Sequence, residues 1–154
     1  AKRGFDQFEV ATLAAAALAD ASRAVLDIKP HPREWESAWR GWLARTANVR
    51  MAEEDTESLL AAADGVLGMT TMVLIEAALA GIPALSLQPE RPVVLNPVLE
   101  EMVPVVTRRA DATGAVRSWL SSLNRPAAPP VGRELLDGAE RLVAAVEDIL
   151  RERA

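Results

Sequence analysis

The sequence contains no cysteine and a single histidine, His31. Without cysteine the chain has no disulfide and no thiolate metal site, and one histidine excludes a multi-histidine metal site. We therefore expect no metal and no cofactor. Lack of disulfides also fits the cytoplasm, which is the location we expect. Lysine is almost as scarce: only Lys2 and Lys29 occur, and Lys29 stands beside the histidine in the segment Lys-Pro-His-Pro.

Several further patterns are missing. The net charge is −5 and no basic cluster occurs, so we expect no nucleic-acid partner. The first residues, Ala-Lys-Arg-Gly-Phe-Asp, have no apolar core behind them, so no secretory signal is expected. The chain lacks the phosphate loop Gly-x4-Gly-Lys and the fingerprint Gly-x-Gly-x2-Gly. It also lacks the acidic cluster with a phosphorylatable aspartate that a receiver module needs.

What is present is a chain of 154 residues, half of them hydrophobic, which suffices for one domain with a substantial core. Its patterns predict helices alternating with short strands, and Thr56 is the expected N-cap of the third helix. The predicted helices cover residues 5–21, 33–45, 56–63, 70–80, 111–123 and 131–153, with at most a short one in 93–101. The predicted strands cover residues 25–28, 49–51, 66–67, 84–87 and 103–107, and residues 126–130 form a linker-like turn.

This alternation predicts an α/β fold: a Rossmann-like, three-layer sandwich with a mostly parallel sheet, in a single domain spanning residues 1–154. The first predicted element is a helix, so the strand expected ahead of it, normally central in such a sheet, is absent. We expect that the chain is a fragment or half of a two-domain enzyme, or that a neighbour supplies the strand.

Three tryptophans, Trp35, Trp39 and Trp42, fall on one face of the second predicted helix. We expect them to pack against the sheet or a neighbouring helix. A docking face for another domain is the second interpretation, ahead of stacking on a ligand.

The stretch from Asp64 to Gln88 is the centre of the predicted fold. Two apolar runs, expected to be strands buried on both faces, enclose a Gly-Met-Thr-Thr turn and a helix. Gly81 and Pro83 end that helix and leave pieces too short to cross a membrane, and Glu76 adds a charge in mid-segment. A lone acid among aliphatic residues is costly without a partner, so we expect a functional role for Glu76.

Residues Gly68 to Thr71 follow one predicted strand, and residues Lys29 to His31 follow another. Carboxyl ends of parallel strands share one rim, where ligands bind, so we expect the two segments to lie together. The hydroxyls of Thr70 and Thr71 cap a helix start, and a helix start also attracts anions. His31 between prolines is alternatively a rigid loop residue, and Lys29 an ordinary charge at a strand end.

Three segments together resemble the C-terminal, donor-binding domain of GT-B-fold glycosyltransferases. They read Asp-Ile-Lys-Pro-His-Pro-Arg-Glu (27–34), Ala-Ala-Asp-Gly-Val-Leu-Gly-Met-Thr-Thr (62–71) and Glu-Ala-Ala-Leu-Ala-Gly-Ile-Pro-Ala (76–84). The chain is also similar to non-hydrolysing sugar-nucleotide epimerases and to polyol-phosphate transferases of bacterial wall polymers, which share that domain. The family pattern usually has serine where Met69, Thr70 and Thr71 stand.

The resemblance implies that a nucleotide-diphosphate sugar binds on the rim, for transfer into bacterial surface polysaccharide or glycoconjugate. It implies that His31 is catalytic and that Lys29, Gly68, Met69, Thr70, Thr71 and Glu76 bind the nucleotide and its phosphates. His31 and Lys29 would offset charge growing on the leaving diphosphate, and Glu76 would accept hydrogen bonds from ribose hydroxyls. It also implies a missing N-terminal acceptor domain, without which the chain binds weakly and is inactive. Contact with the membrane surface and assembly of identical copies stay open.

Two other functions remain as alternatives. One is half of a non-hydrolysing epimerase, which would need further catalytic carboxylates and a partner domain. The other is a non-enzymatic α/β interaction module, since a fold alone does not determine a function.

Overall fold

Helices and strands alternate along the part of the chain that is described. The computed structural model describes residues 7–19, 24–31, 34, 36–89 and 97–123. The helices there are α1 (Gln7–Leu18), α2 (Glu36–Leu43), α3 (Thr56–Ala62), α4 (Met72–Leu79), α5 (Pro97–Met102) and α6 (Arg109–Leu123). The strands are β1 (Leu26–Ile28), β2 (Val49–Met51), β3 (Val66–Gly68), β4 (Ala84–Leu87) and β5 (Val105–Val106).

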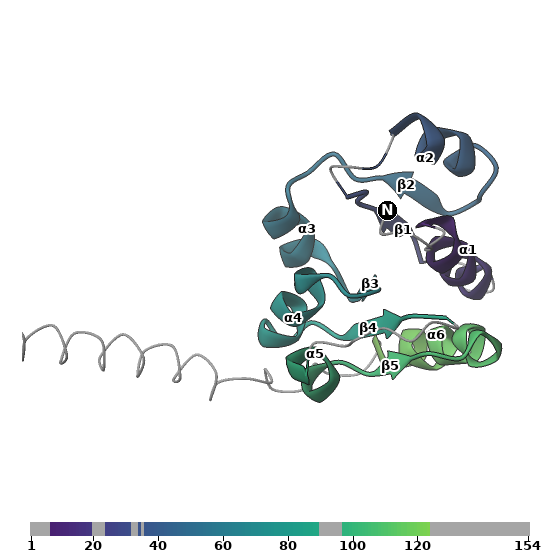
Figure 1. The fold of residues 1–154 in the computed structure, drawn as a ribbon. Helices are drawn as coiled ribbons and strands as arrows, with labels where there is room; N and C mark the ends of the chain where they lie inside the picture. Colours follow the sequence, from purple (N-terminus) through teal and green to yellow (C-terminus); the bar gives the residue numbers. More distant parts are fainter. Residues whose placement is uncertain (1–6, 20–23, 32–33, 35, 90–96, 124–154) are drawn as a thin grey trace, which may run out of the picture.

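The strands form two parallel sheets (Figure 1). In the first sheet β1 pairs with β2. In the second the order is β3–β4–β5, with both outer strands parallel to β4. Within the described residues no strand pairing joins the two sheets, so β1 and β3 each keep one free edge. The predicted α/β class with parallel strands is confirmed, and the arrangement is consistent with a Rossmann-like fold.

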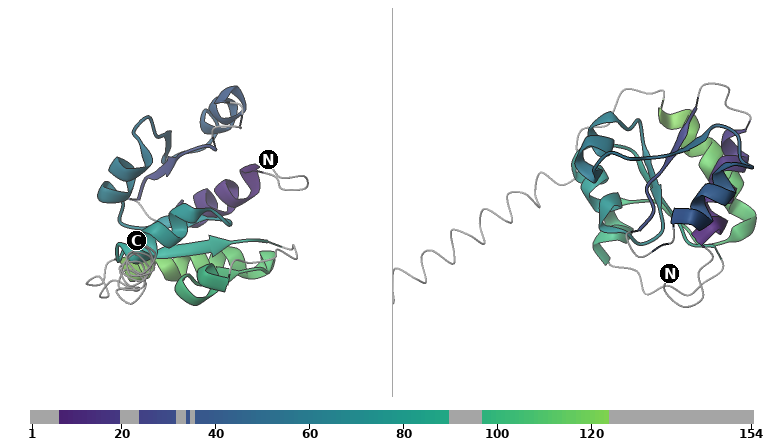
Figure 2. Two further views of the ribbon diagram at one scale, coloured as in Figure 1. Left: turned by 60° about the vertical axis from the view of Figure 1, so that its left-hand side comes forward. Right: turned by 90° about the horizontal axis from the view of Figure 1, so that it is seen from above.

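Helices cover both sides of the strands. α1 and α6 lie side by side on one side (Figures 1 and 2), where Arg109 of α6 donates a hydrogen bond to Glu9 of α1 at 2.6 Å. α3, α4 and α5 lie on the other side (Figure 1). The fully buried Leu74 of α4 and Leu99 of α5 belong to the core on that side, and Leu87 of β4 and Val116 of α6 to the core on the first.

The two strands of the central stretch differ in burial. All four residues of β4 are buried, as expected of a strand with helices on both faces. Each residue of β3 is only half-buried, in contrast to the expectation. The physical reason is position, because β4 lies in the middle of its sheet whereas β3 lies at the edge.

Two of the three tryptophans form an aromatic cluster with α1, which confirms that they pack on a neighbouring helix. The ring of Phe8 lies 4.8 Å from that of Trp39 and 6.4 Å from that of Trp42, measured between centroids. Trp39 is buried, and its indole N–H donates to Glu34 at 2.9 Å. Trp35 lies outside the described residues.

Several helix ends differ from the sequence prediction. The N-cap of α3 is Asp55 and not Thr56: the Asp55 carboxylate accepts from the Ser58 amide at 2.8 Å, which lowers the pKa of that carboxyl. α6 begins at Arg109, two residues before the predicted start at Asp111. β5 has only two residues, fewer than the predicted 103–107. The predicted turn at 126–130 and helix at 131–153 lie outside the described residues.

The turn between α4 and β4 follows the expected chemistry. Gly81 has φ of 77°, a left-handed conformation that glycine adopts without steric cost. Its amide donates to the carbonyl of Ala78 at 3.1 Å, and the amide of Ile82 donates to Ala77 at 2.8 Å. Pro83 then leads into β4 and cannot continue the helix.

Candidate functional site

The first candidate site is the turn between β3 and α4. β3 ends at Gly68, and α4 begins at Met72 after Thr71, whose extended backbone and side chain form the N-cap. The Thr71 hydroxyl accepts from the amide of Val73 at 3.4 Å, and both Thr70 and Thr71 are exposed. Because the first amides of a helix have no partner within it, this helix start offers N–H groups and a positive dipole end to an anion.

Two buried polar residues, one in β4 and one directly after it, hold this turn in place. Ser86 and Gln88 are both fully buried. The Ser86 hydroxyl donates to the carbonyl of Met69 at 2.5 Å, and the Gln88 amide donates to the same carbonyl at 3.2 Å and to the Ser86 hydroxyl at 2.8 Å. The turn is thereby fixed to the carboxyl end of β4.

Sequence reasoning missed Ser86 and Gln88. The available signal was their spacing: two polar residues alternate with Leu85 and Leu87 at the end of an apolar strand, so they share one face. The side-chain oxygen of Gln88 is buried and accepts no hydrogen bond from the described residues. A buried acceptor without a partner costs free energy, so a donor group that reached it would be favoured.

A second candidate site is an open hollow of about 880 Å³ beyond β1. It is bordered by Lys29, Pro30, His31, Glu34, Arg40, Leu43, Ala44, Met51, Ala52 and Glu53. Lys29 and His31 are exposed there, and the Lys29 ammonium donates to the carbonyl of Glu54 at 2.5 Å. The hollow thus combines three basic side chains, those of Lys29, His31 and Arg40, with two acidic ones.

The structure does not bring these two sites into one hollow. None of Gly68, Met69, Thr70 and Thr71 borders the hollow that contains Lys29 and His31. The placement of both segments on one shared rim therefore remains a prediction, even though each follows the carboxyl end of a parallel strand as expected.

Glu76 lies on α4, within a helix whose Leu74, Ile75, Ala77 and Ala78 are buried, yet it is itself exposed. The inference that this acid needs a partner is therefore wrong, because a carboxylate in water pays no cost of burial. Its exposure leaves it accessible to a ligand but gives no independent sign of function.

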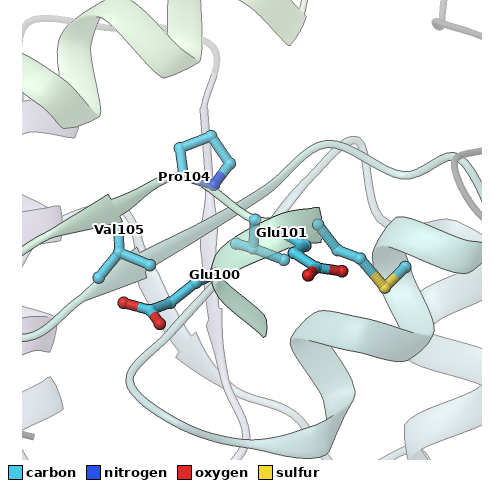
Figure 3. A pocket seen from close by; sticks show the side chains of 6 residues that line it. Glu100, Glu101, Pro104 and Val105 are labelled. Carbon is cyan, nitrogen blue, oxygen red and sulfur yellow. The ribbon is translucent and has the colours of Figure 1, made fainter. Parts of the chain in front are cut away.

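A third hollow, of about 480 Å³, lies where α5 leads into β5 (Figure 3). One continuous stretch, residues 100–105, borders it, and Glu100 and Glu101 supply two exposed carboxylates. This is the amino end of β5, opposite to the end where ligands bind in parallel sheets. The two negative charges would also repel a phosphate, so we do not assign this hollow to an anionic ligand.

In the described residues, no group of three or more histidine, cysteine, aspartate or glutamate side chains could hold a metal ion. Over the same ranges, no helix combines the length and the apolar character that crossing a membrane requires.

Comparison of the chain with protein-family models, with curated proteins and with solved structures finds no match. The structure thus defines a class, an α/β protein with parallel strands, and the function has to be argued from its residues.

Proposed function

We propose that this chain is the donor-binding domain of a cytoplasmic glycosyltransferase that builds surface polysaccharide or glycoconjugate. In this proposal the diphosphate of a nucleotide sugar binds at the amino end of α4. The observation that carries the proposal is the turn at residues 68–71, which puts a capped helix start and two exposed threonines at the carboxyl end of a parallel strand. Helix starts in that position bind phosphate through backbone N–H groups.

Gln88 gives the proposal a second support. Its amide donates to the carbonyl of Met69 and to the hydroxyl of Ser86, which fixes the backbone of the proposed binding turn. A turn that is already fixed loses little conformational freedom when a phosphate binds to it.

Lys29 and His31 have the hydrogen-bond donors that the proposed reaction needs. When a sugar is transferred, negative charge grows on the departing diphosphate, and cationic or N–H donor groups near it lower the barrier. We assign His31 to that role and Lys29 to binding the diphosphate, and the exposed Glu76 to accepting from ribose hydroxyls. For these residues to act together, the ligand must extend from the α4 turn toward the hollow beyond β1.

The order of the strands supports a Rossmann-like half of a two-domain enzyme. In the doubly wound order 3-2-1-4-5-6 the first strand lies in the middle of the sheet. Removal of that strand leaves a pair and a triplet, and β2–β1 and β3–β4–β5 are such a pair and triplet. The acceptor would then bind to a second domain that faces the carboxyl ends of these strands.

A titration with nucleotide diphosphates tests the proposal. We expect the amide NMR signals of Thr71, Met72 and Val73 to shift saturably when UDP or GDP is added up to millimolar concentration. No saturable shift of these three amides, or shifts of the same size at amides throughout the described residues, would refute the proposal.

A matched pair of variants sharpens the test. Thr71→Ser keeps the capping oxygen and Thr71→Val keeps the shape without it. We expect binding to survive in the serine variant and to weaken about tenfold in the valine variant, in line with the loss of one hydrogen bond to a charged group. Gln88→Glu adds a charge next to the phosphates and should weaken UDP binding further, which distinguishes the site from a surface anion site elsewhere.

A further inference from the structure

α3 is the least buried helix of the described residues. It follows β2 of the first sheet and leads to β3 of the second (Figure 1). None of its 7 residues is buried, whereas every other described helix buries at least one side chain. Its half-buried Leu60 packs against the core around Leu74. A helix with so few buried apolar contacts opens locally at a low cost in free energy, so the contacts at its start decide how firmly it is held.

Two kinds of contact hold the start of α3. Within the segment, the Asp55 carboxylate accepts from the Ser58 amide at 2.8 Å, and the Asp55 carbonyl accepts from the Leu59 amide at 3.1 Å. From another part of the chain, the Lys29 ammonium donates to the carbonyl of Glu54 at 2.5 Å. Because Lys29 directly follows β1, this bond ties the start of α3 to the first sheet.

The segment that Lys29 holds is strongly acidic. Within five positions of the sequence it has four exposed acidic residues, which are Glu53, Glu54, Asp55 and Glu57. Their charges attract an ammonium and repel an anion. Glu53 borders the hollow beyond β1, as Lys29 does. An anion that enters this hollow therefore meets an ammonium that is already bonded to an acidic segment.

The anion and the start of α3 compete for Lys29. A charged acceptor forms a stronger hydrogen bond with an ammonium than a neutral carbonyl does. An ammonium has three N–H groups, but a phosphate bonded to one of them would also repel the Glu53 carboxylate in the same hollow. The repulsion is relieved when residues 53–54 move away, and that movement breaks the bond between Lys29 and Glu54.

We propose that the bond from Lys29 to Glu54 is an autoinhibitory contact. In the ligand-free chain the acidic start of α3 occupies Lys29, and an anion that binds Lys29 releases α3. The acidic segment thus lowers the affinity of the hollow for the anion, and α3 loosens when the anion binds. This inference rests on the proposed function, because the anion is taken to be the diphosphate of the donor.

Amide hydrogen exchange of the full chain, measured by NMR, tests the contact without a ligand. Lys29→Met keeps the length of the side chain and removes the ammonium. We expect exchange at Leu59 and Leu60 to become about threefold to tenfold faster, the effect of losing one hydrogen bond, and exchange on α4 to stay the same. Unchanged exchange at Leu59 and Leu60 overturns the proposal.

Addition of UDP tests the release of α3. In the original chain, saturation with UDP should speed exchange at Leu59 and Leu60 by a similar factor, and in Lys29→Met it should have no such effect. UDP that shifts the amides at the start of α4 and leaves exchange on α3 unchanged or slower overturns this inference alone. UDP that loosens α3 without shifting those amides overturns the proposed function alone, and UDP that does neither overturns both.

A matched pair of charge variants tests the competition. Glu53→Gln removes the carboxylate that borders the hollow and should tighten UDP binding about threefold. Glu57→Gln removes an exposed carboxylate that does not border it, and it should change the affinity less. Equal affinities of the two variants for UDP contradict the competition for Lys29.

Discussion

Gly65, directly before β3, is a position where one added methyl group should act strongly. A Cβ atom built there would lie 2.5 Å from Cζ2 of Trp119 and 2.8 Å from Cδ2 of Leu123, both on α6. Real Cβ atoms do not approach other atoms so closely, and the indole of Trp119 is a rigid group packed in the core. We expect Gly65→Ala to destabilise the chain by about 1–3 kcal/mol, the usual cost of overpacking a core.

Gly114→Ala on α6 is the matched control. A Cβ atom at Gly114 would meet nothing within 4 Å, and the residue is exposed in the helix interior. Alanine there should stabilise the chain by about 0.5–1 kcal/mol, because it restricts the unfolded chain and favours the helix. Urea unfolding of both variants measures the difference between their free energies of unfolding, which we expect to be roughly 1.5–4 kcal/mol. Equal midpoints for the two variants would show that α6 does not pack on Gly65 as described.

Three further predictions follow from single contacts. Leu74→Ala should lower the free energy of unfolding by about 2–5 kcal/mol in urea titrations, because Leu74 is fully buried in the core of α4, and a loss below 1 kcal/mol would contradict that packing. Thr71→Ala should cost about 1 kcal/mol in thermal unfolding through loss of the N-cap, whereas Thr71→Ser should cost little. The third concerns Asp27, whose carboxylate accepts hydrogen bonds from the Arg50 guanidinium, one of them at 2.8 Å, and whose pKa is lowered by these bonds and by the charge of Arg50. These bonds therefore stabilise the fold above the unfolded pKa of about 3.9, and the stabilisation is lost as pH falls through the lower folded pKa. In urea titrations Asp27→Asn should have a lower free energy of unfolding than the original chain at pH 7 and an equal one near pH 2. A difference that stays constant between the two pH values would refute the pairing.

The sequence was informative where a local pattern decides the structure. The runs Val49–Met51 and Ala84–Leu87 were predicted with the bounds that the strands have. Gly81 and Pro83 ended the preceding helix as expected, because their backbone restrictions act whatever surrounds them.

Two expectations were wrong because the sequence alone does not show how a residue is oriented in the fold. Asp55 and Thr56 are both good N-caps, and only the chain path shows that the carboxylate of Asp55 reaches the Ser58 amide. Similarly, Glu76 lies in an apolar sequence, but the helical period turns it to solvent while its neighbours are buried.

The sequence predicted the turn of the candidate site but not the two residues that hold it, Ser86 and Gln88. The turn of Gly68 to Thr71 could be found because glycine and hydroxyl residues at the start of a helix form a local signal. The bonds from Ser86 and Gln88 to Met69 join residues more than fifteen positions apart, with 17 and 19 separating them. Such contacts depend on how β4 is placed beside β3, which no local pattern specifies.

The separation of the strands into two sheets has a consequence for the order in which the molecule unfolds. Residues 66–123 carry three consecutive strands with their helices, so this half holds together through neighbours in the chain. β1 and β2 have no ladder to it in the described residues, and α1 packs on both halves. We therefore expect loss of the α1–α6 contact to loosen β1 and β2 before the triplet opens.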